Sequence, residues 1–476
     1  MSHRIAGCLG TVLLATNVAA AQTKALVGGT IFDGTGRAGI SNAVVVITGD
    51  RLTCVGTTAQ CPVPSGAQRI DAAGRFITPG LVDAHVHFSQ TGWVDGRPDG
   101  LSAPALYPYP ETARALRANP ARWYRSYLCS GITAVYDVGG HPWTTTLPAR
   151  AEADPMAPHV RTAGPLITHA SRSALSVDDE IYTFLPMATT GEVQSSVARL
   201  KSMGSSAVKV WYLAPSASRR DELDARMLEV GVAARAAGLD LIVHATGLRE
   251  AKVALRAGAV LLVHSVEDQP VDQEFLGMLA ANRAIYAPTL TVGRNATRAS
   301  VAIGLGVRLP IDDPGGCVDS NTVAKVANVE PLRALIPEDR RAPDIAFRRL
   351  ENLGFRGAVM AENLRRVHAA GGTIVTATDA GNPLTLHGPS IFAEMEAMQA
   401  AGLSASDILL MSTRNGALAM GRSKDFGTLE AGKLADLLVL SEDPSTNVRA
   451  FRSMTHVMKG GRLHQQHTLA QRRLAP

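Results

Sequence analysis

Two histidines two positions apart, His85 and His87, are the first residues whose types and spacing indicate chemistry. They follow the apolar residues Leu81 and Val82. Successive side chains of a β-strand point to opposite faces, so both imidazoles would face the same side. Two neutral imidazoles on one face can bind a metal ion. Two structural histidines without a metal are the simpler alternative, so a metal site requires further ligands from elsewhere in the chain.

Four more polar residues lie within or directly after apolar segments that are typical of buried strands. Lys209 lies inside the apolar segment 207–213, where an unpaired ammonium group would be costly. His244, His264 and Asp379 each end such a segment. A single histidine of this kind is more often structural, and a single aspartate more often caps a helix. Their occurrence together in one chain favours a shared metal site.

The segments that carry these residues alternate with alanine-rich helical segments between about residues 77 and 420. We expect strands at Leu81–Phe88, Thr133–Val138, Val160–Ile167, Ala207–Leu213, Asp240–His244, Val260–His264, Ala284–Thr289 and Thr373–Thr378. This alternation predicts an α/β fold, and a closed (β/α)8 TIM-type barrel rather than a doubly wound sheet. In such a barrel, functional groups gather at the carboxyl ends of the strands. Two connections, 89–130 and 292–370, are long enough to be lids, binding elements or small subdomains.

Both chain ends carry short apolar runs that predict further strands, such as Ala43–Asp50 and Ala435–Leu440. We expect the two ends to form one small β-sandwich domain from residues 22–78 plus 422–476, because separate strands would leave unpaired edges. Residues 79–421 would then form the barrel.

Residues 1–21 have the features of a secretory signal peptide. A basic start at Arg4 precedes an apolar run and the small residues Ala19–Ala21, so we expect cleavage near Ala21 and a secreted or periplasmic protein. The apolar run is too short for a stable membrane span. In an oxidising compartment Cys54 and Cys61 can form a disulfide, and two free thiols are the alternative.

The composition excludes several other classes of protein. A hydrophobic content of 46% and a charged content of 19% are typical of a globular chain with a large core. The net charge of +5 comes from 47 Lys and Arg scattered among 42 Asp and Glu without a basic run. We therefore expect no nucleic-acid partner.

At these residues the chain resembles the amidohydrolase superfamily, in its imidazolonepropionase-like and prolidase-like branch. The resemblance covers almost the whole chain after residue 21, through the motifs Pro79–His87, Lys209, His244, His264, Thr378–Gly381, Asn415–Gly421 and Gly427–Leu437. Two positions depart from the common pattern: Gly416 replaces the more usual Pro of Asn-Pro-Ala, and Val263 stands where Glu often precedes the histidine. Neither departure removes a ligand, but both weaken assignment to a subfamily.

The resemblance implies a centre of two divalent metal ions. His85, His87 and Asp379 would bind the first ion and His244 and His264 the second, while N6-carboxylated Lys209 would bridge both. The alternative is that Lys209 pairs with an acid and only one ion binds. Imidazole ligands with carboxylate support favour Zn²⁺, although manganese, cobalt and iron are alternatives.

Such a centre implies hydrolysis by a metal-bridging hydroxide, with Asp379 accepting a proton and passing it to the leaving amine. His141 follows the second strand and Tyr212 follows the Lys209 strand, so we expect both to contact the substrate or its developing charge. A loop histidine and a strand-end aromatic residue are the alternatives for these two positions.

We therefore expect a secreted amidohydrolase that cleaves an amide or peptide bond of a small molecule, of the dipeptide, Xaa-Pro or N-acyl amino acid type. A cyclic amide, a lactone or a phosphotriester is the alternative substrate for the same centre. A deaminase is disfavoured because it would not need Lys209. A binding protein without catalysis would have no use for the full ligand set. Members of the superfamily often assemble, so a homo-oligomer is consistent with the resemblance.

Overall fold

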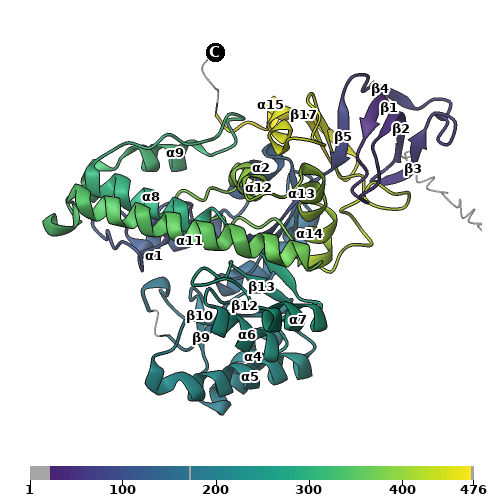
Figure 1. The fold of residues 1–476 in the computed structure, drawn as a ribbon. Coiled ribbons are helices and arrows are strands. Elements are labelled where there is room, and N and C mark those ends of the chain that lie inside the picture. Colours follow the sequence, from purple (N-terminus) through teal and green to yellow (C-terminus); the bar gives the residue numbers. More distant parts are fainter. Residues whose placement is uncertain (1–21, 171–172, 473–476) are drawn as a thin grey trace, which may run out of the picture.

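The computed structural model describes residues 22–170 and 173–472, so the predicted signal peptide lies outside the described residues. The strands form three sheets, and helices surround the two sheets that carry the predicted ligands (Figure 1). Within the described part of the chain, no helix is both long and apolar enough to cross a membrane.

One mixed sheet contains strands from both ends of the chain. Its eight strands are β1 (Thr23–Ile31), β2 (Ile40–Thr48), β3 (Arg51–Thr57), β4 (Gln68–Asp71), β5 (Phe76–Pro79), β16 (Leu437–Leu440), β17 (Met454–Lys459) and β18 (Arg462–Gln465). The strands pair in the order β18-β17-β16-β5-β1-β2-β3, and β4 also pairs with β1. Figure 1 shows the purple amino-terminal strands beside the yellow carboxy-terminal ones. We call this the composite sheet.

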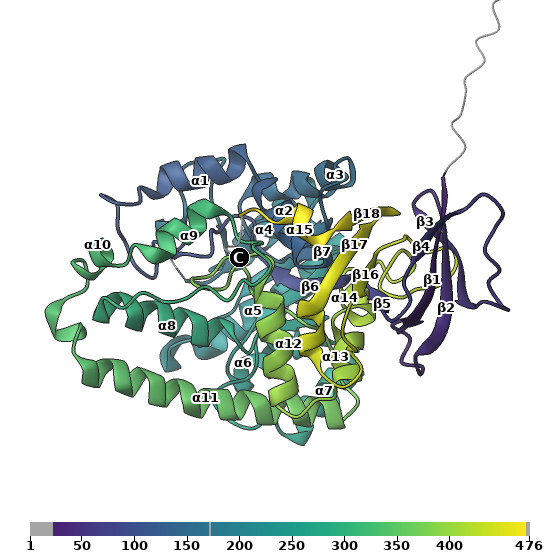
Figure 2. The ribbon, with the colours of Figure 1, turned by 90° about the horizontal axis from the view of Figure 1, so that it is seen from above.

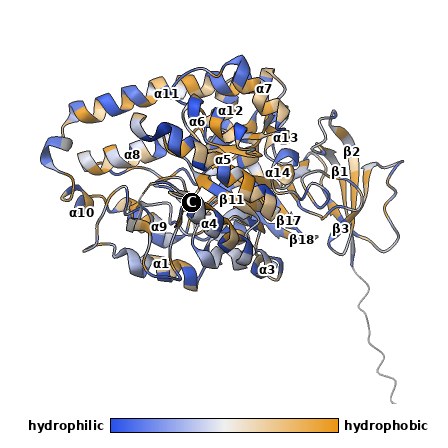
Figure 3. Ribbon diagram, turned by 90° about the horizontal axis from the view of Figure 1, so that it is seen from below, coloured by the Kyte–Doolittle hydropathy of each residue, from blue (hydrophilic) through white to orange (hydrophobic). Residues whose placement is uncertain are grey.

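The composite sheet differs from the predicted sandwich because its strands form one sheet. Strand β1 pairs in parallel first with β4 and then, from Thr30 onwards, with β5, so one long strand serves both partners. Alternation along β2 buries Val45 and Ile47 in one apolar cluster and Val44 and Val46 in another. Apolar colouring follows these strands in Figure 3. The domain boundaries at 78/79 and 421/422 stay predictions.

The remaining strands form two parallel sheets. The first contains β6 (Leu81–Val86), β7 (Ile132–Asp137) and β8 (His159–Thr162). The second contains β9 (Leu166–Thr168), β10 (Phe184–Pro186), β11 (Ala207–Trp211), β12 (Asp240–His244), β13 (Leu261–Val263), β14 (Ile285–Ala287) and β15 (Thr373–Ile374). The single strand predicted over residues 160–167 is divided between β8 and β9.

Backbone hydrogen bonds connect the two parallel sheets at both sides. After β15, the N–H of Asp379 donates to the carbonyl of His85 at 2.7 Å, and the N–H of His87 donates to the carbonyl of Ala380 at 2.8 Å. At the other side, the N–H of Ser206 donates to the carbonyl of Thr162 at 3.0 Å. These bonds bring the predicted ligands together, while a fully closed barrel stays a prediction.

Helices between the strands cover the outside of the parallel sheets. They are α3 (Leu147–Glu152), α4 (Thr190–Ser202), α5 (Arg220–Ala237), α6 (Leu248–Arg256), α7 (Gln273–Ala281), α12 (Ser390–Ala400), α13 (Ala405–Met411) and α14 (Arg414–Ala419), with α15 (Gln466–Leu469) near the chain end. The helix α5 ends at Gly238 with a φ of 67°, a left-handed conformation that glycine adopts without steric cost.

The two long connections pack against each other and form what we call the cap. The first contains α1 (Tyr109–Ala118) and α2 (Arg122–Cys129), and the second contains α8 (Val292–Leu305), α9 (Ser320–Ala327), α10 (Glu330–Arg333) and α11 (Pro343–Ala369). Trp93 lies in an apolar cluster with Ile303 and Leu332, and Lys325 contacts Asp95 at 2.5 Å. Figure 2 shows α8, α9, α10 and α11 on the side away from the composite sheet.

Two disulfides stabilise these parts. Cys54 and Cys61 form a disulfide, which is one of the two alternatives from the sequence analysis. Cys129, at the end of α2, is bonded to Cys317 in the second long connection, a pairing that the sequence analysis did not identify. The second disulfide therefore links α2 of the first long connection to the second long connection, so it joins the two parts of the cap.

A buried histidine joins the parallel sheets to the composite sheet. His159 on β8 contacts Asp436, which directly precedes β16, at 2.9 Å and Glu152 at 2.8 Å. Its ring stacks on Phe426 with the ring centroids 5.1 Å apart. Burial by itself would lower the pKa of His159, but the hydrogen bonds to Asp436 and Glu152 outweigh it, so the pKa of His159 is raised.

We expect His159→Gln to destabilise the protein by about 3 kcal/mol at pH 6, because the buried Asp436 carboxylate would lose its cationic partner. A raised histidine pKa gives a stabilisation that is complete below the unfolded-state pKa, about 6.5, and is lost as the pH rises through the folded-state pKa. Thermal unfolding at a series of pH values should therefore show a deficit that shrinks at alkaline pH. His456→Gln is the matched control, because His456 contacts the hydroxyl of Thr455 and has no acidic partner within residues 22–170 and 173–472. A deficit that grows with pH would contradict the ion pair.

Candidate metal centre and active site

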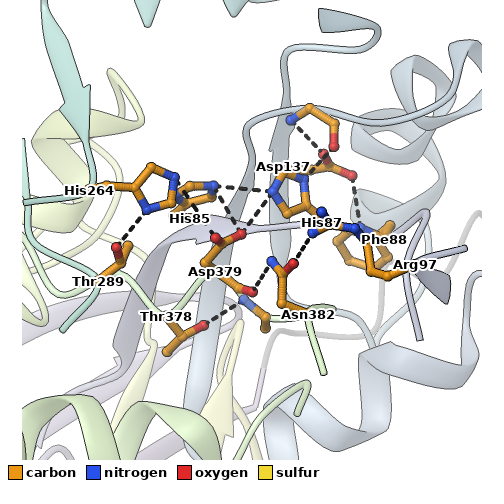
Figure 4. A network of polar contacts seen from close by, with 12 residues as sticks. His85, His87, Phe88, Arg97, Asp137, His264, Thr289, Thr378, Asp379 and Asn382 are labelled. Atoms are coloured by element: carbon orange, nitrogen blue, oxygen red, sulfur yellow. Dashed lines mark hydrogen bonds and ion pairs between the residues drawn. The ribbon is translucent and has the colours of Figure 1, made fainter. Parts of the chain in front are cut away.

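His85 and His87 lie at the end of β6 and point to the same side, as their spacing predicts. The Nε2 atoms of the two rings are 3.2 Å apart. Both face Oδ1 of Asp379, at 3.3 Å from His85 and 2.9 Å from His87. These three side chains are buried, and their donor atoms lie within 4.8 Å of one another. Figure 4 shows them in contact at the centre of the site.

His244 and His264 extend this group along the ends of the next strands. Nε2 of His264 lies 3.9 Å from Oδ2 of Asp379, and the rings of His244 and His264 have centroids 4.3 Å apart. Nδ1 of His264 lies 2.8 Å from the hydroxyl of Thr289. The predicted imidazole ligands therefore converge with Asp379, and we call these five residues the ligand row.

The backbone is strained at three positions of the site. His264, Thr289 and Asp379 have φ values of 76°, 44° and 63°, a region that residues other than glycine seldom adopt. Strain of this kind costs on the order of 1–3 kcal/mol per residue and persists only where the surrounding structure enforces it. Here the turns at the strand ends direct two ligands towards one point.

Burial disfavours the charged form of three histidines of the ligand row. The pKa values of His85, His244 and His264 are lowered well below the usual range, first by burial and then by neighbouring positive groups. Neutral imidazole is the form that binds a metal ion. His87 donates from Nδ1 to the carbonyl oxygen of Gly139, which leaves Nε2 as the ring atom that faces Asp379.

Lys209 on β11 lies in the same buried space. Its side chain is 2% exposed, and burial lowers its pKa to about 8, against the opposing effect of Asp379 and Asp137. An amine with a pKa so lowered is partly unprotonated near neutral pH, which is the form that can react with carbon dioxide. The environment of Lys209 therefore fits the carbamate that the resemblance implies.

Asp379 remains ionised in spite of its burial. Burial alone would raise its pKa, but the neighbouring His87, His264 and Lys209 lower it. Its Oδ1 atom and Nδ1 of His85 are buried and have no hydrogen-bond partner. Such atoms are rare in folded proteins unless an ion or a ligand satisfies them. A divalent metal ion fits this donor set.

Two further buried carboxylates hold the strands that carry the ligands. Asp83 accepts hydrogen bonds from the N–H and hydroxyl of Thr378 at 3.0 and 2.6 Å and from the N–H of His85 at 3.2 Å. Asp137 accepts from the N–H groups of Phe88 and Gly139 at 3.1 and 3.0 Å. Sequence reasoning missed both residues, although an aspartate inside an apolar strand is the signal that indicates them.

A third buried carboxylate fixes the segment next to His264. Glu394 on α12 is fully buried and accepts hydrogen bonds from the N–H of Leu290 at 2.6 Å and from the N–H and hydroxyl of Thr291 at 3.0 and 2.8 Å. These bonds fix the segment that follows β14, which includes Thr289. Glu394 therefore positions the hydroxyl that contacts His264.

The ligand row opens into a cavity of about 950 Å³ at the carboxyl ends of the strands. Its walls include the ligands, Lys209 and residues of α8 and α11, so the cap forms part of the wall. Another cavity, of about 560 Å³, lies at the amino ends of the strands between residues such as Tyr136 and Thr373, and no predicted ligand lines it. The larger cavity is the candidate active site.

Arg97 in the first long connection lines this cavity and was not predicted. Its guanidinium group donates to Asp99 at 2.8 and 2.9 Å and to the side chain of Asn382, which itself donates to the carbonyl of Asp379. These contacts use three of its five N–H groups. Figure 4 shows Arg97 beside Asn382. No sequence pattern distinguishes this loop arginine from the others.

The two predicted substrate contacts lie outside the cavity lining. His141 is buried against the hydroxyls of Tyr109 at 3.3 Å and Thr183 at 3.4 Å. The hydroxyl of Tyr212 donates to Asp224. Side chains alternate along β11, so Lys209 and Trp211 face the cavity and Tyr212 faces away. Trp211 therefore lines the cavity and Tyr212 does not, while the substrate contacts of His141 and Tyr212 stay predictions.

The chain is similar to several known proteins. It is 24% identical over 433 residues to an imidazolonepropionase of Streptomyces coelicolor, which covers 88% of this chain and 90% of that protein. It is 40% identical over 65 residues to a 5-methylthioadenosine/S-adenosylhomocysteine deaminase of Symbiobacterium thermophilum, where the match spans only 13% of this chain and 15% of the relative. Among solved structures, a Xaa-Pro dipeptidase with methionine bound in its active site has the same fold. It has 21% identity and a TM-score of 0.70, and the match covers 93% of this chain and 100% of that one.

The chain also matches the model of a protein family over most of its length. Residues 76–464 match the amidohydrolase family, a range that includes β5, both parallel sheets, the cap and almost all of the carboxy-terminal strands. With its ligand row at the strand ends inside that range, the chain belongs to the amidohydrolase family.

Proposed function

We propose that the protein is a metal-dependent hydrolase of carbon–nitrogen bonds, with a centre of two divalent ions, most simply Zn²⁺. The observation that carries this proposal is the row of converging imidazoles around one ionised carboxylate, open to a substrate-sized cavity. His85, His87 and Asp379 would hold one ion and His244 and His264 the other, with N6-carboxylated Lys209 between them. A closed barrel of the two parallel sheets would carry this centre.

The protein's own residues supply the proton transfer. When bound, ions at such a centre supply Lewis acidity, which activates water and polarises a carbonyl group. The ionised carboxylate of Asp379 would accept the proton of the attacking water at Oδ1 or Oδ2 and deliver it to the nitrogen of the leaving amine. The bond broken is the carbon–nitrogen bond of the amide, and the products are an acid and an amine.

Arg97 supports a substrate with a carboxylate. Its unused N–H groups line the same cavity, and its contact with Asn382 fixes it next to Asp379. A guanidinium group binds a carboxylate through charge-assisted hydrogen bonds. We therefore propose a dipeptide, an Xaa-Pro peptide or an N-acyl amino acid as the substrate, with its carboxylate bound by Arg97.

The two disulfides support export from the cytoplasm. Disulfides persist in secreted and periplasmic proteins and are rare where thiols are kept reduced. We propose that residues 1–21 are removed on export. Mass spectrometry of the exported protein should show a chain that begins at Gln22. Recovery of the protein only as a full-length chain from Met1 in the cytoplasm would contradict this.

Lys209→Ala should reduce the bound metal from about two ions per chain to about one or fewer, because the bridging ligand would be lost. Elemental analysis of purified protein, together with thermal unfolding, measures this independently of activity. Lys201→Ala, an exposed lysine on α4, is the matched control. An unchanged ion count in the Lys209→Ala protein would contradict the bridging carbamate.

A hydrolysis screen tests the proposed substrate class. Xaa-Pro and other dipeptides, N-acyl amino acids, lactones and phosphotriesters would be offered to protein of measured metal content. We expect turnover of amides with a free carboxylate, and a kcat/KM about ten- to hundredfold lower for the same compounds capped as carboxamides.

In Arg97→Met this preference should disappear, mainly through a higher KM for the free acids. Arg348→Met, an exposed arginine of α11 outside the cavity lining, should keep it. Turnover of lactones or phosphotriesters without turnover of any amide would overturn the proposed function.

A further inference from the structure

Two aromatic side chains form one wall of the cavity beside the ligand row. Trp211 ends β11, two residues after Lys209, and Phe184 begins β10. Their rings are nearly parallel, at 13°, with centroids 5.4 Å apart. Both line the cavity and both are only partly buried, in contrast to the fully buried aromatic residues of the core. We call this pair the aromatic wall.

Two leucines contribute apolar surface near the aromatic wall. Leu166 and Leu175, which also line the cavity, are 7% and 4% exposed and lie on the segments that carry or precede β9 and β10. The charged side chains of the cavity lining other than Lys209 and the ligand row come from the first long connection, from the segment after β13 and from the helices α8 and α11. The part of the lining at the aromatic wall therefore offers apolar surface to a substrate.

The contacts at the two ends of the ligand row favour one orientation of a substrate. Arg97 contacts Asn382, and Asn382 contacts Asp379 at the His85 and His87 end of the ligand row. At the other end, the ring of His244 meets the ring of Trp211 at 83°, with centroids 5.7 Å apart. A substrate with its carboxylate on Arg97 and its amide at the ligand row would therefore extend its acyl side towards Trp211.

We propose that Trp211 and Phe184 are specificity-determining residues that select substrates with a large apolar or aromatic group on the acyl side of the scissile amide. This proposal rests on the proposed function and narrows its substrate class. The physical reason is that a flat apolar group on the aromatic wall removes exposed aromatic surface from water and stacks on it. Small or charged acyl groups gain neither effect.

Matched substrates measure this selection. Dipeptides that share one carboxy-terminal residue and carry glycine, alanine, leucine, phenylalanine or glutamate as the first residue would be compared by kcat/KM. We expect phenylalanine and leucine to exceed alanine by about thirtyfold, the factor that burial of the additional apolar surface provides. Glutamate should rank below alanine.

Variants of the wall test the residues themselves. In Trp211→Leu and in Phe184→Leu the ratio of kcat/KM between the phenylalanine and alanine substrates should fall about tenfold. Because both substrates are measured on the same protein, partial unfolding or metal loss cancels in this ratio. Phe347→Leu changes a phenylalanine of α11 that is 62% exposed and outside the cavity lining, and should leave the ratio as it is. An unchanged ratio in both wall variants would overturn the assignment.

A binding measurement provides a readout without turnover. Free phenylalanine and free alanine, the acids released from these substrates, would be titrated into the metal-loaded protein by calorimetry. Tighter binding of phenylalanine that is lost in Trp211→Leu supports the aromatic wall, and equal binding of the two overturns it.

The outcomes separate the two proposals. Equal hydrolysis of all the dipeptides contradicts the aromatic wall and leaves the proposed function in place. Absence of hydrolysis of every amide contradicts the proposed function, and the specificity assignment falls with it.

Discussion

Exclusion of water from the ends of the parallel strands is the constraint on which the site depends. Several imidazoles and a lysine amine can share one buried space only if few of them carry a proton, because unpaired charges in such a space repel each other and lose hydration. The pKa values of His85, His244, His264 and Lys209 are lowered because burial disfavours their charged forms. Asp379 is the carboxylate that faces this group, and its ionised state complements a bound cation.

The rest of the fold maintains this exclusion. Asp83 and Asp137 accept hydrogen bonds from Thr378 and Phe88, next to the ligand row. Glu394, on the outer helix α12, accepts a hydrogen bond from Thr291 in the segment before α8. The cap is fixed by its own apolar cluster and by the Cys129–Cys317 disulfide. The same cap helices line the cavity, so the elements that keep water from the ligand row also provide the surface that a substrate meets.

The convergence of the ligand row was predictable from the sequence because chemistry and secondary structure coincide at those positions. Each ligand ends an apolar segment, and parallel strands bring their carboxyl ends together whatever the loops do. Strand-end positions alone did not identify the residues that line the rest of the cavity. Tyr212 is a candidate from the sequence because its hydroxyl could donate to developing charge, whereas in the structure that hydroxyl contacts Asp224 and Trp211 lines the cavity. Arg97 and Cys317 lie in the long connections, where no periodicity indicates which residues approach one another.

The composite sheet has a consequence for the order of folding. Strand β5 lies between β1 and β16, so one of its edges is formed only by residues that come from the far end of the chain. A chain made from its amino end must keep that edge unpaired while the parallel sheets and the cap are synthesised, and an unpaired edge is open to pairing with other chains. Completion of the composite sheet is therefore tied to the arrival of β16. Loss of the chain from β16 onwards would leave one edge of β5 unpaired and open to aggregation, although the ligand row lies elsewhere.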